Sequence, residues 1–227
     1  MTRLAATLAI DVRLQSRNGF YVATALVVVA SALLLRWLPA EAARLLLPVV
    51  ILENVLTNTF YFVSGLLLLE RGEGTFSAQS VTPLRDVEYL GSKLITLTAL
   101  SLAESLIIAA AVIGLDAQLV LMALGIALSA VLFCLAGVAL VARYGSVNEF
   151  LMPSVLYTSV LSLPVLGVFG VGPPEAYVLH PIQGPLALLQ IDVPMTAGWL
   201  VYAIGYPILW IAPAYVWSRR ALARIRH

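Results

Sequence analysis

The sequence predicts an all-α membrane protein that crosses a bilayer six times and keeps both termini in the cytoplasm. Three observations predict this fold: the composition, the lengths of the apolar runs and the placement of the basic residues. Of the 227 residues, 61% are hydrophobic and 11% are charged, and the mean hydropathy is +0.98. Soluble domains are about half apolar and about a quarter charged. A chain of this composition cannot expose its surface to water, so we expect an integral membrane protein.

The apolar runs have the lengths of membrane-spanning helices. A hydrocarbon core about 30 Å thick needs about 20 apolar residues in a helix. Six runs meet that length, and they are the predicted spans of a single transmembrane domain: 20–38, 45–69, 89–115, 119–141, 150–171 and 195–217. The segments around them are an N-terminal helix at 1–19, a short connection at 70–88, a longer one at 172–194 and a basic tail at 218–227.

The basic residues orient these spans. Eleven of the 13 Lys and Arg residues fall at the N-terminus, around the 70–88 connection, in the next loop on that side or in the tail. Cytoplasmic segments carry an excess of Lys and Arg, so both termini and the 70–88 connection are expected in the cytoplasm. The richness in Arg, Ala, Leu and Val suggests a prokaryotic protein of the plasma (inner) membrane. The formal charge of +1 offers no basic face large enough for nucleic acid.

The N-terminal segment 1–19 is expected to form an amphipathic helix. Its apolar stripe contains Leu4, Leu8 and Val12, and a polar stripe contains Arg3, Thr7, Asp11 and Gln15. This arrangement predicts a helix that lies at the membrane interface. The alternative is a basic flank that only helps to orient the first span.

The 70–88 connection gathers charge and helix-breaking residues between two spans. Gly72 and Gly74 are expected to end the second span at the membrane surface. Thr82-Pro83 favours a further turn, because the residue before proline avoids the helix and proline suits the first turn of a new one. Residues 75–81 between them can form about two helical turns. The alternative is a short solvated hairpin.

Four groups of residues in and near this connection resemble the signature of the ABC transporter type-2 exporter permeases. They are Glu70, Glu73-Gly74-Thr75, Thr82-Pro83-Leu84 and Gly91-Ser92-Lys93. The resemblance extends to the whole chain in its expected topology. In overall size and in the Pro-rich segment before the last span, the chain is loosely similar to small drug-export permeases, including the fluoroquinolone exporter group. Ala78, Gln79 and Ser80 stand where members of the family often have Leu.

The resemblance implies that the connection is a coupling helix that docks on a separate ATPase subunit. The implied coupling residues are Glu70, Arg71, Glu73, Gly74, Thr75, Thr82, Pro83, Leu84 and Arg85. It also implies a second permease copy or a sister permease, and short re-entrant helices in the external 172–194 segment. ATP and Mg are expected on the partner subunit, because this chain has no G-x-x-x-x-G-K-[ST] phosphate loop. The chain itself is therefore expected to hold no cofactor and to catalyse no reaction.

Polar residues on one side of the spans predict a substrate path. At 100° per residue, the polar side chains of the second span fall within an arc of about 140°, and facing them to lipid would be costly. The predicted path comprises Glu53, Asn54, Thr57, Asn58, Tyr61, Ser64, Ser101, Glu104, Ser154, Thr158, Tyr202 and Tyr206. The alternative is that the hydroxyl and amide groups join helices to one another, and that the tyrosines belong to an interfacial aromatic belt.

The resulting hypothesis is the permease subunit of an ATP-driven exporter that moves a small amphipathic compound, drug-like or lipid-like, by alternating access. Two alternatives remain: a haem-export membrane subunit of cytochrome c maturation, and a non-transporting membrane scaffold. An intramembrane enzyme is disfavoured, because the predicted spans contain no His or Asp and no His-Glu-x-x-His motif. His180 has no second His or Cys near it, as a metal site would need, and the single cysteine, Cys134, cannot form an intrachain disulfide and is expected to be a packing residue. The sequence does not indicate which compound is moved.

Overall fold

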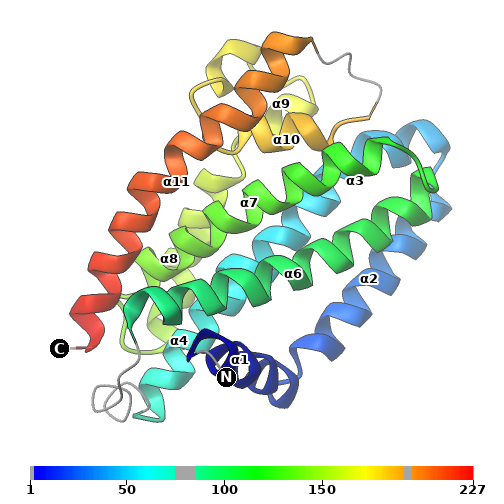
Figure 1. The fold of residues 1–227 in the computed structure, drawn as a ribbon. Coiled ribbons are helices and arrows are strands. Elements are labelled where there is room, and N and C mark those ends of the chain that lie inside the picture. The colour runs from blue at the N-terminus through cyan, green and yellow to red at the C-terminus, as the bar shows by residue number, and fades with distance from the viewer. Residues whose placement is uncertain (1–2, 75–84, 192–195, 227) are drawn as a thin grey trace.

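The computed structural model describes residues 3–74, 85–191 and 196–226, and their regular structure is helical. The long helices lie side by side in one bundle, and the N- and C-termini lie at the same end of it (Figure 1). Residues 75–84, which include most of the predicted coupling helix, lie outside the described residues. The end of the bundle that carries the termini is called the terminal end below, and the other is called the distal end.

In the described ranges the chain forms ten α-helices, one π-helical turn and one 3-10 turn. They are α1 Arg3–Arg17, α2 Phe20–Trp37, α3 Ala40–Leu56, a π-helical turn Thr57–Tyr61, α4 Phe62–Gly72, α6 Asp86–Ile113, α7 Gln118–Val141, α8 Val147–Leu161, α9 Val165–Val168, a 3-10 turn Pro174–Tyr177, α10 Gln183–Leu189 and α11 Ala197–Arg226. The π-helical turn joins α3 to α4 without a break, so these three elements form one continuous helix across the predicted second span.

Five helices in the described ranges are long and apolar enough to cross a membrane: 20–37, 40–72, 86–113, 118–141 and 197–225. They match five of the six predicted spans within a few residues, although α11 continues to Arg226 through most of the predicted basic tail. The chain is thus an all-α multi-pass membrane protein.

The predicted span at 150–171 is not a single helix. α8 has 15 residues and is therefore about 22 Å long, and the chain then turns before the short α9. The break falls just before Pro164, where the missing N–H and the restricted preceding residue oppose a continuous helix. α8 nevertheless runs from the terminal end of the bundle towards the distal end (Figure 1).

α7 forms the centre of the bundle and packs against α3, α6, α10 and α11. Its buried side chains include Ile126, Phe133 and Val138. α2 and α11 lie at the outside, and large apolar side chains such as Leu26 and Leu209 are mostly exposed on them. In a membrane protein such a surface faces lipid, so the apolar residues of this chain serve both a packed interior and a hydrocarbon-facing exterior.

Two glycines allow helices to approach closely. A Cβ on Gly137 of α7 would lie 2.8 Å from the carbonyl oxygen of Phe60, and one on Gly184 of α10 would lie 2.8 Å from that of Ala203. Any larger residue would push these backbones apart. Gly137 therefore seats α7 against the π-helical turn, and Gly184 seats α10 against α11.

The short helices of the predicted external segment lie at the distal end (Figure 1). α10 is buried from Gly184 to Leu189. The side-chain amide of Gln118, at the start of α7, donates to the carbonyl oxygen of Gln190 at 3.0 Å. The short helices expected here are present, and α10 is wedged into the protein. Its insertion into the membrane as a re-entrant helix stays a prediction.

Candidate functional site

A buried ion cluster joins three helices at the terminal end. The ammonium group of Lys93 on α6 lies 2.7 Å from Oδ1 of Asp11 on α1 and 2.6 Å from Oε1 of Glu70 on α4. The hydroxyl of Ser92 donates to the second oxygen of Asp11, and that of Tyr89 donates to the second oxygen of Glu70. All four carboxylate oxygens therefore accept a hydrogen bond. We call these five residues the Lys93 cluster.

The cluster is sealed from solvent. The side chain of Lys93 is 0% exposed, that of Asp11 3% and that of Glu70 6%. Lys93 Nζ also lies 4.9 Å from the ring centroid of Tyr89, which is a cation–π contact. Buried charges are tolerated when they are paired and their remaining atoms are hydrogen-bonded. The cluster meets both conditions.

The predicted amphipathic helix is present as α1, and its polar stripe faces the protein. Thr7, Asp11 and Gln15 are buried, whereas Ile10 and Val12 are 58% and 45% exposed. Nε2 of Gln15 donates to the hydroxyl of Thr96 at 2.9 Å, one turn beyond Lys93 on α6. α1 thus binds α6 through polar groups and leaves apolar side chains outside, which is the surface that a helix at a membrane interface needs.

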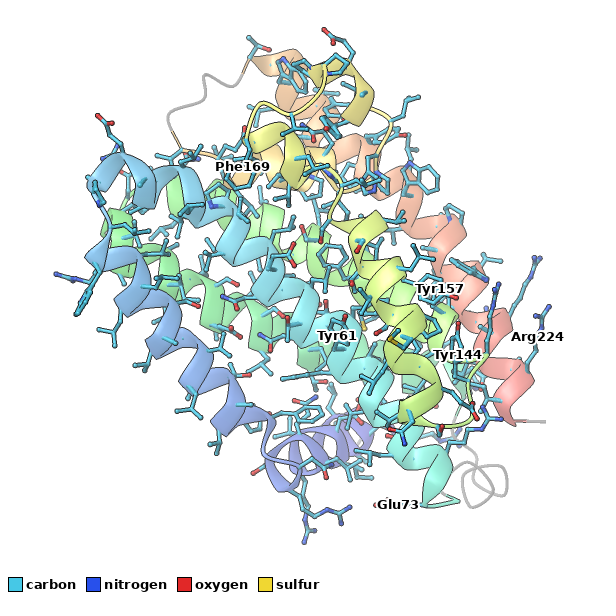
Figure 2. The ribbon with its side chains drawn as sticks, turned by 180° about the vertical axis from the view of Figure 1, so that it is seen from behind. Tyr61, Glu73, Tyr144, Tyr157, Phe169 and Arg224 are labelled. Carbon is cyan, nitrogen blue, oxygen red and sulfur yellow. The ribbon has the colours of Figure 1, made fainter. Side chains whose placement is uncertain are left out.

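The Lys93 cluster holds both ends of the 70–88 connection. Glu70 lies at the end of α4, and Lys93 lies in the second turn of α6. Arg71 and Glu73 lie outside the cluster: Nη1 of Arg71 donates to the carbonyl oxygen of Tyr144 at 2.8 Å, and Glu73 forms an exposed ion pair with Arg17 at 3.7 Å. Figure 2 shows Glu73 at the terminal end.

Of the other predicted coupling residues, the structure describes Gly74 and Arg85. Gly74 has a positive φ of 69°, which ends the helix as expected. The backbone N–H of Arg85 donates to Oε2 of Glu88 at 3.0 Å, which caps the start of α6. The predictions for Thr75, Thr82, Pro83 and Leu84 fall outside the described residues. Glu70 was also predicted to be a coupling residue, but its side chain is buried in the Lys93 cluster.

A second polar group lies on α6 nearer the middle of the bundle. The side-chain amide of Asn58, in the π-helical turn, donates to Oε2 of Glu104. The hydroxyl of Thr24 on α2 donates to Oδ1 of Asn58 at 3.4 Å, and the amide of Asn54 donates to the hydroxyl of Ser31 at 3.4 Å. We call Asn58, Glu104 and the hydroxyl groups of α6 beside them the Glu104 cluster.

Several buried oxygens in this region have no hydrogen-bond partner among the described residues. They are Oε1 of Glu104 and the hydroxyl oxygens of Thr98, Ser101, Ser105 and Ser129. Most buried polar atoms in proteins are hydrogen-bonded, so such a group calls for a physical explanation. These atoms can form hydrogen bonds with water, with a ligand, or with other side chains if the helices are rearranged.

The predicted polar arc of the second span has an inner and an outer part in the structure. Asn54 and Asn58 are buried against α2 and α6, whereas Glu53 and Tyr61 are half-buried and Thr57 is exposed. A uniform 100° rotation per residue does not hold through a π-helical turn, because it contains one extra residue. The residues predicted for one arc therefore divide between an inner side, against α2 and α6, and an outer side.

The outer part of the arc faces α8. The hydroxyl of Tyr61 lies 3.3 Å from that of Thr158 on α8, and Figure 2 shows Tyr61 in the middle of the bundle. The side chain of Glu53 forms no hydrogen bond or ion pair with the described residues, and the hydroxyl of Thr57 donates to the backbone carbonyl of Glu53 at 2.9 Å. The outer part thus leaves one carboxylate without a partner.

The remaining predicted path residues make contacts that hold the protein together. The hydroxyl of Ser64 donates to the carbonyl oxygen of Gly137 at 3.5 Å, and that of Ser154 donates within its own helix to Leu151 at 2.6 Å. Tyr202 and Tyr206 donate to the carbonyl oxygens of Val178 and Leu179 at 2.6 and 2.7 Å. The structure therefore brings neither tyrosine to the Glu104 cluster. Both tyrosines join the segment before α10 to α11 through hydrogen bonds.

His180 makes a similar contact in that segment. Its Nε2 lies 3.1 Å from the carbonyl oxygen of Val160 on α8, and its Nδ1 accepts from the N–H of Ile182 at 3.2 Å. Burial lowers the pKa of the His180 ring, and the hydrogen bond to Val160 opposes this effect in part. The neutral ring is a structural link between α8 and the segment before α10.

Sequence reasoning did not place Asp11, Tyr89 and Ser92 beside Lys93. Two signals pointed to the contact: the polar stripe of α1 repeats every four residues, and Lys93 is the sole lysine of the chain and lies inside an apolar run. A lysine at that depth needs an acidic partner. The two signals together would have paired the polar stripe of α1 with the start of α6.

Long apolar helices that enclose buried polar groups without a partner among the described residues define a class, the multi-pass membrane proteins. Residues 2–225 match the fluoroquinolones export permease protein family, and the chain belongs to that family. Two relatives, from strains CDC 1551 / Oshkosh and ATCC 25618 / H37Rv of Mycobacterium tuberculosis, are named fluoroquinolones export permease proteins. Each is 33% identical to this chain over 213 residues, which are 92% of this chain and 90% of the relative. No solved structure matches the chain.

Proposed function

We propose that this chain is the permease subunit of an ATP-driven exporter and that it moves a small amphipathic, drug-like compound out of a prokaryotic cell. The names of its relatives favour a fluoroquinolone-type compound over haem. The separate ATPase subunit binds ATP and Mg, and the permease works with a second permease subunit, a copy of itself or a sister chain. The observation that carries the proposal is that both ends of the 70–88 connection bind one buried lysine.

This anchorage supports the assignment of the connection as the coupling segment. A displacement applied to residues between α4 and α6 reaches Lys93 from both sides, because Glu70 and Tyr89 are held in the same cluster. A fully hydrogen-bonded cluster in a low-dielectric interior is rigid. The displacement would therefore move α4, α6 and α1 together. Arg71, Glu73, Thr75 and the Thr82-Pro83-Leu84 run would make the contact with the ATPase.

The route of the compound would be lined by the outer part of the polar arc, which consists of Glu53, Thr57 and Tyr61. Thr158 of α8 would complete this lining. Glu53 suits a cationic or zwitterionic compound, because its carboxylate has no partner among the described residues and an intramembrane charge favours a counter-ion. The second permease subunit would close the open side of this route. Asn54, Asn58, Ser101 and Glu104 lie one layer further in, where they would exchange hydrogen bonds as the helices move in alternating access.

The orientation that the proposal needs is the one that the basic residues predict. The terminal end, with the coupling segment, faces the cytoplasm, and the distal end, with α9 and α10, faces outside. Six crossings would require α8 and α9 to form the fifth, and the position of the two termini at one end of the bundle is consistent with an even number of crossings (Figure 1).

Reconstitution tests the proposal. The permease and the ATPase subunit that copurifies with it are placed in liposomes, and ATP-dependent movement of a fluorescent fluoroquinolone is measured. We expect Glu73→Gln and Thr75→Ala to lower export at least about tenfold, with less effect on the ATPase activity of the complex, because these changes weaken the coupling contact and the exposed ion pair of Glu73 with Arg17 adds little to stability. Glu175→Gln is the matched control, since Glu175 is an exposed acid at the distal end.

Two outcomes would contradict the proposal. One is unchanged export in both coupling variants, which would remove the coupling role of the 70–88 connection. The other is ATP-independent export by the permease alone, which would remove the separate ATPase.

A further inference from the structure

A basic groove lies at the terminal end between the last turns of α7 and α11. It has a volume of about 320 Å³ and is lined by Arg143, Arg220, Arg224 and Trp217, with small alanine side chains as its floor. Arg224 projects from the last turns of α11 at this end (Figure 2). Two segments far apart in the sequence thus contribute positive charge to one hollow.

The three arginines of the groove are unpaired. None of them forms a hydrogen bond or ion pair with any residue in the described ranges, and no acidic side chain lines the groove. Arg220 and Arg224 are four residues apart, so they project from the same face of α11. Arg219 differs, because its guanidinium lies 5.9 Å from the ring centroid of Tyr215. The groove therefore concentrates three positive charges without a neutralising group from the described residues.

The groove lies at the depth of lipid headgroups. α11 has 30 residues and is about 45 Å long, whereas about 20 residues cross the hydrocarbon core. The last two or three turns consequently lie beyond the core. Trp217 is 44% exposed where those turns begin, and tryptophan is enriched at that level of a membrane. Val216 beside it is 45% exposed, so an apolar surface continues from the groove into the hydrocarbon.

We propose that this groove binds the phosphate group of an anionic phospholipid from the leaflet at the terminal end. Guanidinium groups hold phosphate oxygens through paired hydrogen bonds, and basic pockets between helices at this depth are suited to lipid headgroups. Trp217 packs against the glycerol region, and an acyl chain lies along the apolar face of α11. A bound lipid joins the end of α11 to the end of α7. The site does not depend on the transported compound or on an ATPase.

Lipid retention by the full-length chain tests the site. The purified protein is exchanged into mixed micelles that contain equal amounts of phosphatidylglycerol and phosphatidylcholine, and the retained lipids are counted by native mass spectrometry. We expect the wild type to retain phosphatidylglycerol about tenfold more than phosphatidylcholine. Each of Arg143→Gln, Arg220→Gln and Arg224→Gln should reduce this preference about fivefold, since one basic residue near an anionic surface contributes about that factor.

Arg219→Gln is the matched control, because it removes the same charge from the adjacent position outside the groove. It should keep the preference of the wild type. Thermal midpoints in phosphatidylcholine alone should agree among all variants, which shows that the substitutions do not unfold the chain. Equal retention of the two lipids by the wild type would overturn the proposal, and so would equal losses in Arg219→Gln and Arg220→Gln.

A further arm separates a lipid from soluble phosphate. Inorganic phosphate at millimolar concentration is added during the exchange. A lipid site should keep phosphatidylglycerol, because the acyl chain on α11 adds binding that free phosphate lacks. Complete displacement by inorganic phosphate would instead assign the groove to a soluble anion and would contradict the lipid.

Discussion

The Lys93 cluster and the Glu104 cluster lie on the same helix, and they differ in how completely their polar atoms are satisfied. Eleven residues separate Lys93 from Glu104 on α6, which corresponds to about 16 Å. In the first cluster, all four carboxylate oxygens accept hydrogen bonds. In the second, one oxygen of Glu104 and several neighbouring hydroxyls have no partner among the described residues.

This difference indicates two roles. A buried polar network that is fully satisfied makes one arrangement of its helices much more favourable than others. A network with open hydrogen-bonding positions does not, because an alternative arrangement or a bound molecule can satisfy it equally well or better. The Lys93 cluster is the fixed part of the bundle, and the Glu104 cluster is the part that can change its partners.

The largest expected effect comes from Lys93→Met. The substitution leaves Asp11 and Glu70 buried without a cation, and removal of one partner from a buried ion pair costs about 3–5 kcal/mol. We expect the variant to lose most of its folded population in detergent, measured by fluorescence-detected size exclusion and by the thermal midpoint.

The triple variant Lys93→Met, Asp11→Asn, Glu70→Gln separates charge from packing. It removes all three charges and keeps the side chains similar in size, so it should recover most of the folded population. Stability equal to wild type in Lys93→Met alone would show that the buried ion cluster does not hold the three helices.

A smaller effect on stability is expected from Glu104→Gln. The amide oxygen of the new side chain can still accept from Asn58, so the loss of stability should be less than about 1 kcal/mol, the usual net contribution of one hydrogen bond. Export should change more than stability, because the ionisable group of this cluster is removed. Thermal midpoints and transport rates are compared with those of Ser129→Ala, a buried hydroxyl on α7 that carries no charge. If Glu104→Gln unfolds the chain as Lys93→Met does, the two clusters have the same role.

The smallest expected effect on stability comes from His180, which lies outside both clusters and serves as a reference for them. Its pKa is lowered in the folded protein because the ring is buried, so the unfolded chain binds a proton more readily. Its contribution to stability is therefore present at neutral pH and is lost as the pH falls below the unfolded pKa of about 6.5. Thermal midpoints from pH 7.5 to pH 5 should fall less in His180→Gln than in the wild type. Identical slopes would exclude His180 as a source of the pH dependence.

The sequence predicted the helices well because span length and apolar composition are local properties. Five of the six predicted spans agree with long apolar helices of the structure, and a helix, α1, forms within the predicted N-terminal segment. The prediction failed where the outcome depends on neighbouring helices. The side of α1 that faces the protein depends on Lys93, which lies about 80 residues away along the chain, and neither segment alone shows which partner it meets.

The candidate site was predicted less completely than the fold. Glu53, Asn58 and Glu104 are polar groups inside apolar runs, and their cost in lipid marks them in the sequence. The π-helical turn at Thr57–Tyr61 could not be inferred, because one extra residue per turn leaves no compositional trace. Within this turn Asn58 meets Glu104, and the hydroxyl of Tyr61 lies beside that of Thr158 on α8.

The position of Lys93 also sets an order for the biogenesis of the protein. α1 leaves the ribosome long before α6, and Asp11 then has no lysine to bind. Asp11 is paired only after the third long helix, α6, has been made and brings the ammonium group of Lys93 beside it. A nascent chain that ends before Lys93 would therefore lack the ion pairs that join α1 and α4 to α6.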